Sequence, residues 1–269
     1  MVYTNVTEHV KIGDAPADFQ RLAPSFTVSL QPWQEQLLFL RLMYKSTFRM
    51  PTFNDLYYYR LGNRSLRPEK ANEYNMGITW SRSFSSFLNY LSVTVDGYYN
   101  DVTDKIVAFP TTYAWKMANY GKVHVTGMDA TLAAAASLGK NMVLVVSGGY
   151  TWQKAIDLTD ATSKSYKDQL PYTPKHSGNV SAVLEMPWVN VGYSIVGVSE
   201  RYSMSQNIPE NRIDGYMEHT ASLSRNFSFR HCKLRLQAEI INMTDTQYDV
   251  IKYYPMPGRS WRLTGTIEF

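Results

Sequence analysis

Two segments rich in tyrosine and arginine are the strongest candidates for binding chemistry in this sequence. The first, residues 55–64, contains Tyr57, Tyr58, Tyr59, Arg60 and Arg64. The second lies near the C-terminus and contains Tyr253, Tyr254 and Arg259. Tyrosine rings pack against the rings of a ligand, and guanidinium groups pair with its acidic groups. Both segments therefore predict contact with a small ligand. The alternative is packing within the loops, with lipopolysaccharide contacts for the first segment.

Patterns typical of catalytic or metal sites are absent from the sequence. The five histidines have no metal-ligand spacing, and a single cysteine, Cys232, rules out a thiolate zinc cluster. No nucleophile elbow, phosphate-binding loop or dinucleotide fingerprint occurs. The 27 Lys and Arg are spread among 23 Asp and Glu, so there is no basic stripe for nucleic acid. We therefore expect no catalytic residue, metal, cofactor or nucleic-acid partner.

The elements that must position the two segments are β-strands. The chain has 269 residues, 44% hydrophobic and 14% aromatic, and it contains no apolar run long enough for a transmembrane helix. Apolar residues recur at every second position, as in Tyr74, Met76, Ile78 and Trp80, and helical spacing is nowhere sustained. This period predicts about eleven strands. We place them at residues 24–32, 36–48, 71–82, 88–102, 115–137, 141–153, 173–186, 189–201, 214–228, 233–246 and 259–269.

The predicted connections alternate between short turns and long loops. The long loops are residues 47–70, 103–114, 154–172, 202–213 and 247–258. Short turns at one end and long loops at the other are the layout of an outer-membrane barrel. A soluble β-sandwich also alternates polar and apolar residues, but these strands are unusually long and aromatic residues gather near their ends. The sequence therefore favours an all-β, antiparallel transmembrane barrel.

Polar residues on the last two predicted strands form a second group with possible roles. Lys233, Arg235, Gln237 and Glu239 alternate with apolar residues, and Arg262 and Glu268 lie on the neighbouring strand. One interpretation is a polar wall that faces a plug inside the barrel. We prefer the other, in which ordinary ion pairs shape the wall.

Several segments, in the same order along the chain, resemble motifs of TonB-dependent outer-membrane receptors. The sequence departs from the usual pattern at Asn75 and Asp129, where the family commonly has Glu. The matching segments are Phe48–Tyr57, Gly62–Asn63, Leu66–Lys70, Glu73–Gly77, Asn119–Gly121, Gly127–Asp129, Leu170–His176, Asn242–Tyr248 and Tyr254–Ser260. The family ends its last strand with an aromatic residue, and Phe269 occupies that place.

The resemblance implies a domain organisation. Receptors of this family form 22-stranded barrels with a plugged lumen. We expect this chain to be the C-terminal half of such a barrel, with residues 1–23 as a leading loop or linker, residues 24–269 as barrel, and no plug domain. An odd number of strands cannot complete a bacterial barrel, so the chain alone is expected not to form a sealed pore.

The resemblance also implies a function in the bacterial outer membrane. It indicates uptake of a scarce nutrient or metal chelate, most commonly a ferric siderophore, with cobalamin, haem or a glycan as alternatives. The implied partners are outer-membrane lipids, the TonB complex through the missing plug segment, and the barrel-assembly machinery through Phe269. The alternatives are a passive porin or adhesin barrel and, less favoured, an outer-membrane barrel enzyme such as a protease or phospholipase.

Overall fold

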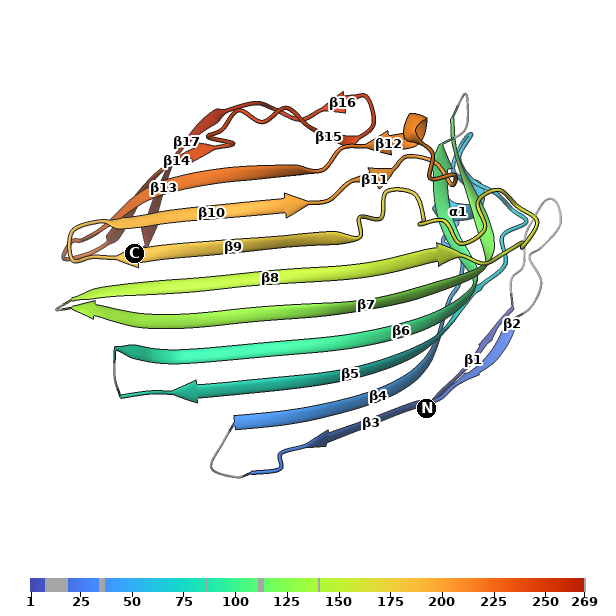
Figure 1. The fold of residues 1–269 in the computed structure, drawn as a ribbon, viewed down its shortest axis with the longest axis horizontal. Coiled ribbons are helices and arrows are strands. Elements are labelled where there is room, and N and C mark those ends of the chain that lie inside the picture. Colours follow the sequence, from blue (N-terminus) through green and yellow to red (C-terminus); the bar gives the residue numbers. More distant parts are fainter. Residues whose placement is uncertain (8–18, 34–36, 86, 111–113, 140, 269) are drawn as a thin grey trace.

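The computed structural model describes residues 1–7, 19–33, 37–85, 87–110, 114–139 and 141–268, and Figure 1 shows their arrangement. None of the helices among these residues is long and apolar enough to cross a membrane. The elements in chain order are β1 (Val2–Val6), β2 (Phe19–Ala23), β3 (Ser25–Leu30), β4 (Leu37–Arg49), α1 (Phe53–Tyr57), β5 (Glu69–Ser83), β6 (Leu88–Pro110), β7 (Trp115–Gly139), β8 (Met142–Asp157), β9 (His176–Glu185), β10 (Asn190–Val198), β11 (Arg201–Tyr202), the 3₁₀ helix η1 (Pro209–Asn211), β12 (Arg212–Ile213), β13 (Tyr216–Ser228), β14 (Lys233–Ile241), β15 (Asp249–Ile251), β16 (Tyr254–Pro255) and β17 (Ser260–Glu268).

One large sheet of eleven strands forms the body of the molecule, in the order β17-β14-β13-β10-β9-β8-β7-β6-β5-β4-β3. Neighbouring strands are antiparallel, and the order follows the chain, so the sheet is a continuous meander. The sheet curves as an open wall with β3 at one edge and β17 at the other (Figure 1). The expected all-β antiparallel architecture and the eleven strands are confirmed.

Short strands of two or three residues occur in the predicted loops 202–213 and 247–258, and two other segments differ more strongly from the expected strand pattern. Residues 103–114, expected to be a long loop, are mostly strand, because β6 and β7 stay paired from Thr103↔Lys122 as far as Pro110↔Trp115. The polar residues around Asp104, which has a positive φ of 54°, give the sequence a turn-like appearance. Residues 1–23, expected to be a leading loop or linker, contain β1 and β2, which pair antiparallel with each other.

The two faces of the sheet have different chemistry. We call the face that carries Tyr74, Met76 and Ile78 the outer face, since these apolar side chains are 49%, 59% and 41% exposed. The opposite, inner face carries polar side chains that bond across strands. Its contacts are Arg41–Asp96 at 2.8 Å, Thr79–Thr94 at 3.1 Å, Ser81–Ser92 at 2.7 Å and Arg262–Glu239 at 2.6 Å. The Arg262–Glu239 pair confirms a wall ion pair between the last two strands.

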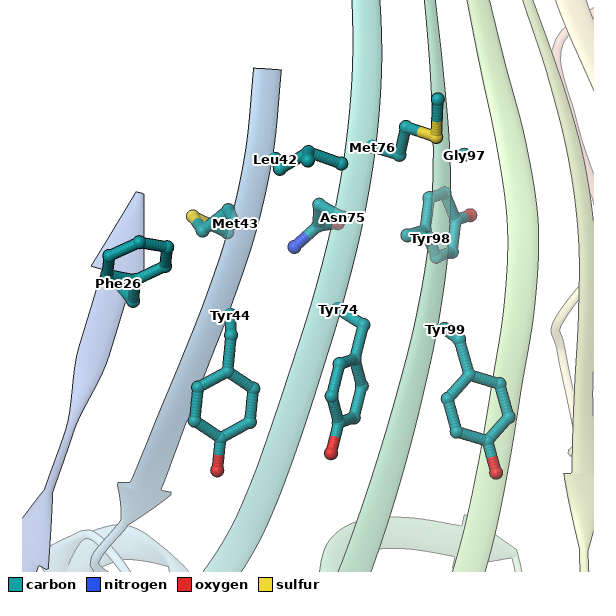
Figure 2. A pocket seen from close by; sticks show the side chains of 10 residues that line it. All are labelled: Phe26, Leu42, Met43, Tyr44, Tyr74, Asn75, Met76, Gly97, Tyr98 and Tyr99. Atoms are coloured by element: carbon teal, nitrogen blue, oxygen red, sulfur yellow. The ribbon is translucent and has the colours of Figure 1, made fainter. Parts of the chain in front are cut away.

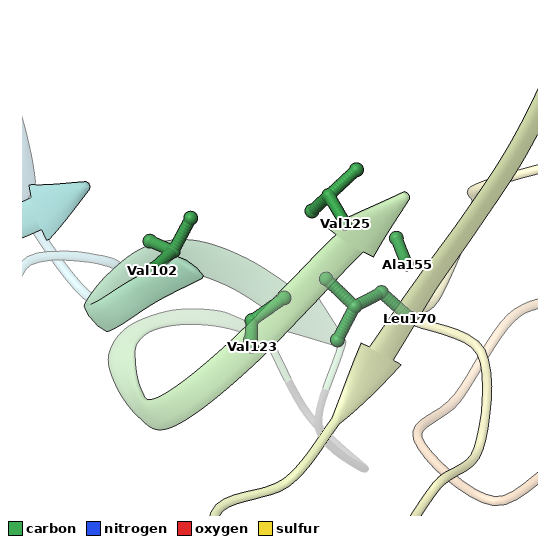
Figure 3. Packing of buried hydrophobic residues seen from close by; sticks show 5 residues of the cluster. All are labelled: Val102, Val123, Val125, Ala155 and Leu170. Atoms are coloured by element: carbon green, nitrogen blue, oxygen red, sulfur yellow. The ribbon is translucent and has the colours of Figure 1, made fainter. Parts of the chain in front are cut away.

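The buried core is small and lies where long loops fold back onto the inner face. Val102, Val123, Val125 and Ala155 come from β6, β7 and β8, and Leu170 reaches them from the loop after β8 (Figure 3). The backbone N–H of Leu170 donates to the carbonyl of Ala155 at 2.8 Å, which ties the loop to the sheet. A single sheet has no second layer to cover it, so these loop contacts provide most of its buried apolar packing.

Gly127 on β7 is closely surrounded by both a side chain and the backbone of neighbouring strands. A Cβ at this position would lie 2.4 Å from the Tyr98 ring and 2.7 Å from the backbone oxygen of Trp152. Gly127→Ala is therefore expected to lower the free energy of unfolding by about 1–3 kcal/mol, because the Trp152 backbone cannot move aside cheaply. Thermal unfolding in detergent measures the change. Gly97→Ala is the matched control, since a Cβ there meets no atom nearer than 3.9 Å. Equal stabilities of the two variants would contradict this account.

Candidate functional site

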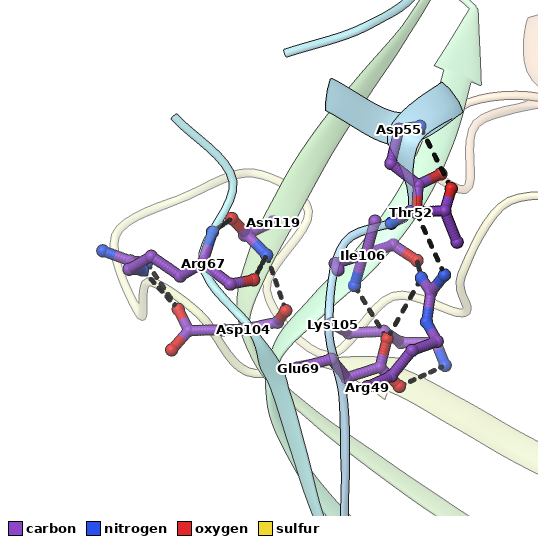
Figure 4. A network of polar contacts seen from close by, with 9 residues as sticks. All are labelled: Arg49, Thr52, Asp55, Arg67, Glu69, Asp104, Lys105, Ile106 and Asn119. Atoms are coloured by element: carbon purple, nitrogen blue, oxygen red, sulfur yellow. Dashed lines mark hydrogen bonds and ion pairs between the residues drawn. The ribbon is translucent and has the colours of Figure 1, made fainter. Parts of the chain in front are cut away.

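The long connection between β4 and β5 is held by a polar network at the end of the sheet where the long loops lie (Figure 4). Thr52 caps α1 in a capping box with Asp55, in which the Asp55 N–H donates to Thr52 Oγ1 at 3.2 Å. Arg49, the last residue of β4, pairs with Asp55 at 3.3 Å and with Glu69 at 3.5 Å, and it donates to the carbonyl of Ile106 at 3.1 Å. Arg49 thus joins the end of β4 to α1, β5 and β6.

A second set of contacts fixes the far end of the same loop. The Asn119 amide on β7 donates to the carbonyls of Arg67 at 3.0 Å and Asp104 at 2.7 Å, and its oxygen accepts from the Arg67 N–H at 2.9 Å. The Glu69 carboxylate also accepts from the Ile106 N–H at 2.9 Å. These contacts give several of the family-like motifs a structural role, because Asn119, Arg67 and Glu69 hold the base of the loop and leave its tip exposed.

The tip of this loop carries the first group of candidate residues. Tyr57 is half-buried and packs against a small cluster of Leu56, Leu66 and Ile106. The Arg64 guanidinium lies 5.2 Å from the centre of the Tyr57 ring. Tyr58 and Tyr59 are 58% and 79% exposed, and the Arg60 guanidinium lies 5.2 Å from the Tyr59 ring centre. Tyr57 is therefore a packing residue in this structure, whereas Tyr59 and Arg60 form an exposed aromatic and cationic tip.

The second group lies on the loop between β14 and β17. Tyr253 and Tyr254 are 81% and 70% exposed, and Arg259 is exposed. Tyr253 has a positive φ of 68° at the turn between β15 and β16, and its N–H donates to Asp249 Oδ2 at 2.9 Å. Both groups belong to the end of the sheet with the long loops (Figure 1), but no described contact joins one group to the other.

Asn242 and Asp245 hold the second loop in shape. Asn242 is 1% exposed, accepts from the Thr246 N–H at 2.9 Å and donates to the Thr246 carbonyl at 2.9 Å. Asp245 Oδ1 accepts from the Arg259 N–H at 2.8 Å, which closes the base of the loop. The motif that begins at Asn242 therefore fixes the backbone conformation of the loop between β14 and β17.

We expect Asn242→Ala to expose the segment 243–258 to limited proteolysis. The substitution leaves the half-buried backbone N–H and carbonyl of Thr246 without their Asn242 partners, at a cost of about 1 kcal/mol for each group. Cleavage within the loop should accelerate, while the barrel strands stay resistant. Thr244→Ala is the control, because Thr244 is exposed and its side chain bonds only to Thr246 Oγ1 among the described residues. A cleavage rate equal to that of the control would show that Asn242 does not fix the conformation of this loop.

Sequence reasoning missed a buried arginine beneath the second loop. Arg201 is 4% exposed, and its Nη2 donates to the carbonyls of Asp249 at 2.6 Å and Val250 at 3.0 Å. Its guanidinium lies 5.8 Å from the centre of the Tyr216 ring. Among the described residues Nη1 has no hydrogen-bond partner, which is rare for a buried charged group. No local pattern signals Arg201, since its partners lie almost fifty residues further along the chain.

Tyr248 extends this cluster towards the loop surface. Its ring stacks on Tyr216 with centres 3.9 Å apart and planes 13° apart, and its hydroxyl donates to Glu218 Oε2 at 2.5 Å. Burial raises the pKa of Tyr248, and the Glu218 carboxylate raises it further, so the phenol stays protonated and keeps donating. Tyr248 therefore links the inner face at β13 to the second loop.

A hollow of about 300 Å³ opens beside Tyr248, between the last two long loops. Its polar lining includes Arg212, Asp214, Lys252 and Tyr253. Arg212 pairs with Asp214 at 2.8 Å, and the Lys252 ammonium donates to the carbonyl of Glu210. Among the described residues no three His, Cys, Asp or Glu come together as a set of metal ligands. The arrangement provides aromatic surfaces and cations for non-covalent binding.

An open antiparallel wall of long strands, with an apolar outer face and long loops at one end, is the architecture of a portion of a transmembrane β-barrel. Residues 3–243 match the family described as "TonB dependent receptor-like, beta-barrel". The chain belongs to this family.

Curated relatives and solved structures agree with this assignment. The chain is 25% identical over 230 residues to the vitamin B12 transporter BtuB of Photobacterium profundum, and 26% identical over 231 residues to that of Vibrio vulnificus. Each match covers 82% of this chain and 34% or 33% of the relative, so the chain spans about a third of their length.

The solved structures show the same fold at low sequence identity. The unliganded ferric citrate transporter FecA superposes with a TM-score of 0.72 at 15% identity, covering 92% of this chain and 38% of FecA. The siderophore receptor PiuA from Acinetobacter baumannii gives a TM-score of 0.69 at 20% identity, covering 94% of this chain and 36% of PiuA.

Proposed function

We propose that the protein containing this chain is a bacterial outer-membrane receptor that imports a scarce nutrient in a TonB-dependent step. The chain supplies part of the barrel wall and two ligand-contacting loops. The observation that carries the proposal is the placement of exposed tyrosine and arginine side chains at the long-loop end of a wall that belongs to this family. The chemistry is binding and gated passage, without bond-making.

We further propose that the cargo is a ferric siderophore. Arg60, Arg64 and Arg259 are exposed, and no ion pair with an acidic side chain neutralises them among the described residues. Exposed guanidinium groups next to tyrosine rings suit an anionic chelate with aromatic or carboxylate groups. PiuA, which superposes well on this chain, is a siderophore receptor.

A corrinoid is the second candidate cargo, because both curated relatives described above are vitamin B12 transporters. The two cargoes differ in charge. A ferric siderophore complex with net negative charge depends on the exposed arginines, whereas a corrinoid presents a large, mostly neutral surface to the tyrosines. Substitution of the arginines therefore separates the two possibilities.

Fluorescence quenching of the complete purified receptor tests the cargo. We expect saturable binding of one ferric chelate from a panel of catecholate, hydroxamate and citrate complexes, and weaker binding of cyanocobalamin. Saturable binding of cyanocobalamin, without binding of any ferric chelate, would mean that the cargo is a corrinoid and not a siderophore. No binding of either class, together with passive ion conductance in planar bilayers, would favour a porin. Recognition by the barrel-assembly machinery through Phe269 stays a prediction, since that residue lies outside the described residues.

A further inference from the structure

The extension of β6 and β7 beyond the large sheet contacts loops of both candidate groups. β5 stops pairing with β6 at Thr103, and β8 stops pairing with β7 at Val123. Beyond these positions β6 and β7 pair only with each other among the described residues, over residues 104–110 and 115–121, which we call the ribbon. A two-stranded ribbon is marginally stable alone, so its position depends on the loops that it contacts.

The first candidate loop, residues 50–68, is bonded to both strands of the ribbon. On β6, both backbone groups of Ile106 bond to side chains at the two ends of this loop. On β7, the Met117 N–H donates to the carbonyl of Leu61 at 3.0 Å, and the Met117 carbonyl accepts from the Asn63 amide at 3.1 Å. Leu61 directly follows the exposed tip, so the ribbon fixes the backbone next to that tip.

The ribbon also contacts the loops that follow β8 and β10. The hydroxyls of Tyr120 and Ser205 are hydrogen-bonded at 2.6 Å, and the half-buried Tyr120 ring packs against the cluster that contains Val123. The ring centres of Trp115 and Tyr172 lie 5.9 Å apart. Within the part of the chain that the structure describes, Tyr120–Ser205 is the one side-chain hydrogen bond between the ribbon and these two loops.

The loops after β8 and β10 form one body with the second candidate loop, residues 242–259. The Asn207 N–H donates to Asp168 Oδ2 at 2.9 Å, and the Asn207 amide donates to the carbonyl of Gln169 at 3.0 Å. These bonds join the loop after β8 to the loop after β10. The loop after β10 also carries Arg201, which holds two carbonyls of the second candidate loop. The ribbon therefore lies between the first candidate loop and this body.

We propose that Tyr120 is a positioning residue that couples the two candidate loops through the ribbon. Its hydroxyl ties the ribbon to Ser205, and the ribbon carries the first candidate loop, so a displacement of either candidate loop is transmitted to the other. That both loops contact one cargo rests on the proposed function, whereas the coupling between them depends on the contacts of this chain alone.

Hydrogen exchange of the complete receptor without cargo tests the coupling. Tyr120→Phe should accelerate exchange over residues 55–64 about fivefold, the effect of losing one typical hydrogen bond. Arg201→Met should accelerate it about threefold, since residues of one hydrogen-bonded network are commonly coupled by that much or more. In the Tyr120→Phe background Arg201→Met should have no further effect over residues 55–64, because the connection is already broken. Effects that multiply would show two independent residues and would contradict the coupling.

Tyr98→Phe is the matched control for Tyr120→Phe. Tyr98 lies on β6 within the sheet (Figure 2), packs against the same buried cluster, and has its hydroxyl 3.5 Å from Gln153 Oε1. Exchange over residues 55–64 should stay at the parent rate in the control. Ser205→Ala removes the same hydrogen bond from its other end and should reproduce Tyr120→Phe. The shift in gel mobility on heating shows that each variant folds.

The outcomes separate this inference from the proposed function. Equal exchange over residues 55–64 in Tyr120→Phe and Tyr98→Phe would overturn the coupling. Faster exchange over residues 249–255 in Arg201→Met, without a change over residues 55–64, would overturn it as well. A receptor that binds no cargo but shows the expected exchange pattern would contradict the proposed function and leave the coupling standing.

Discussion

A receptor in which Arg60, Arg64 and Arg259 are all replaced by Gln is expected to bind the proposed ferric chelate about a thousandfold more weakly. A hydrogen bond to a charged group contributes about 1.5–3 kcal/mol, so the loss of each arginine weakens binding about tenfold or more. The barrel should fold normally, since all three side chains are exposed. Fluorescence titration gives the affinity, and the shift in gel mobility on heating reports folding.

The control for this variant removes the same charge from the same end of the sheet. Lys116→Gln, Lys164→Gln and Lys175→Gln alter exposed lysines outside the two candidate loops. We expect the control to bind the chelate within about threefold of the parent protein, because these lysines lie outside both loops and exposed charges that do not touch the ligand are weakened by salt screening. Equal weakening in both triple variants would mean that general charge attraction, and not the two loops, determines affinity.

Arg201→Met should release the loop that carries Tyr253 and Tyr254. The substitution keeps an unbranched apolar stem but removes the guanidinium, and with it both hydrogen bonds to the carbonyls of Asp249 and Val250. Breaking buried charged hydrogen bonds costs about 3 kcal/mol, and we expect that loss of stability to concentrate in this loop. Hydrogen exchange should accelerate over residues 249–255 while the strands of the wall stay protected.

Arg225→Met is the matched control for Arg201→Met. Arg225 also lies over an aromatic ring, 4.9 Å from the centre of Phe227, but it is exposed. The control should leave exchange over residues 249–255 at the parent rate. Should Arg201→Met leave exchange there unchanged as well, the buried arginine would not be the residue that holds the loop.

The strands were predictable because the alternation of apolar and polar residues is present within each strand's own sequence. Tyr74, Met76 and Ile78 alternate with polar residues whatever the neighbouring strand contains, and β5 is found within two residues of its predicted ends. The antiparallel order followed from the short turns, which leave adjacent strands no other partner. The helix α1, which begins with the capping box of Thr52 and Asp55, was not predicted, because it is only five residues long and lies within a predicted loop.

The candidate site at the long-loop end was harder to predict because its contacts join distant parts of the chain. The tyrosine and arginine content indicated both loops as candidate ligand contacts. The burial of Tyr57 could not be predicted, because it depends on Leu66 and Ile106, which contact it only in the folded chain. The extension of β6 beyond Asp104 depends on pairing with β7. The polar residues around Asp104 indicated a loop instead. Arg201 carries no local signal, since its role is set by carbonyls of a loop that follows two further strands.

Uptake of radiolabelled iron by whole cells tests the central claim most directly. Cells that carry the intact gene should accumulate iron from one ferric siderophore, and cells without the gene should not. Collapse of the proton gradient should abolish accumulation while leaving surface binding intact, because TonB-dependent transport draws its energy from that gradient. Iron accumulation that is equal with and without the gene for every chelate, or that persists after the gradient is collapsed, would contradict the account.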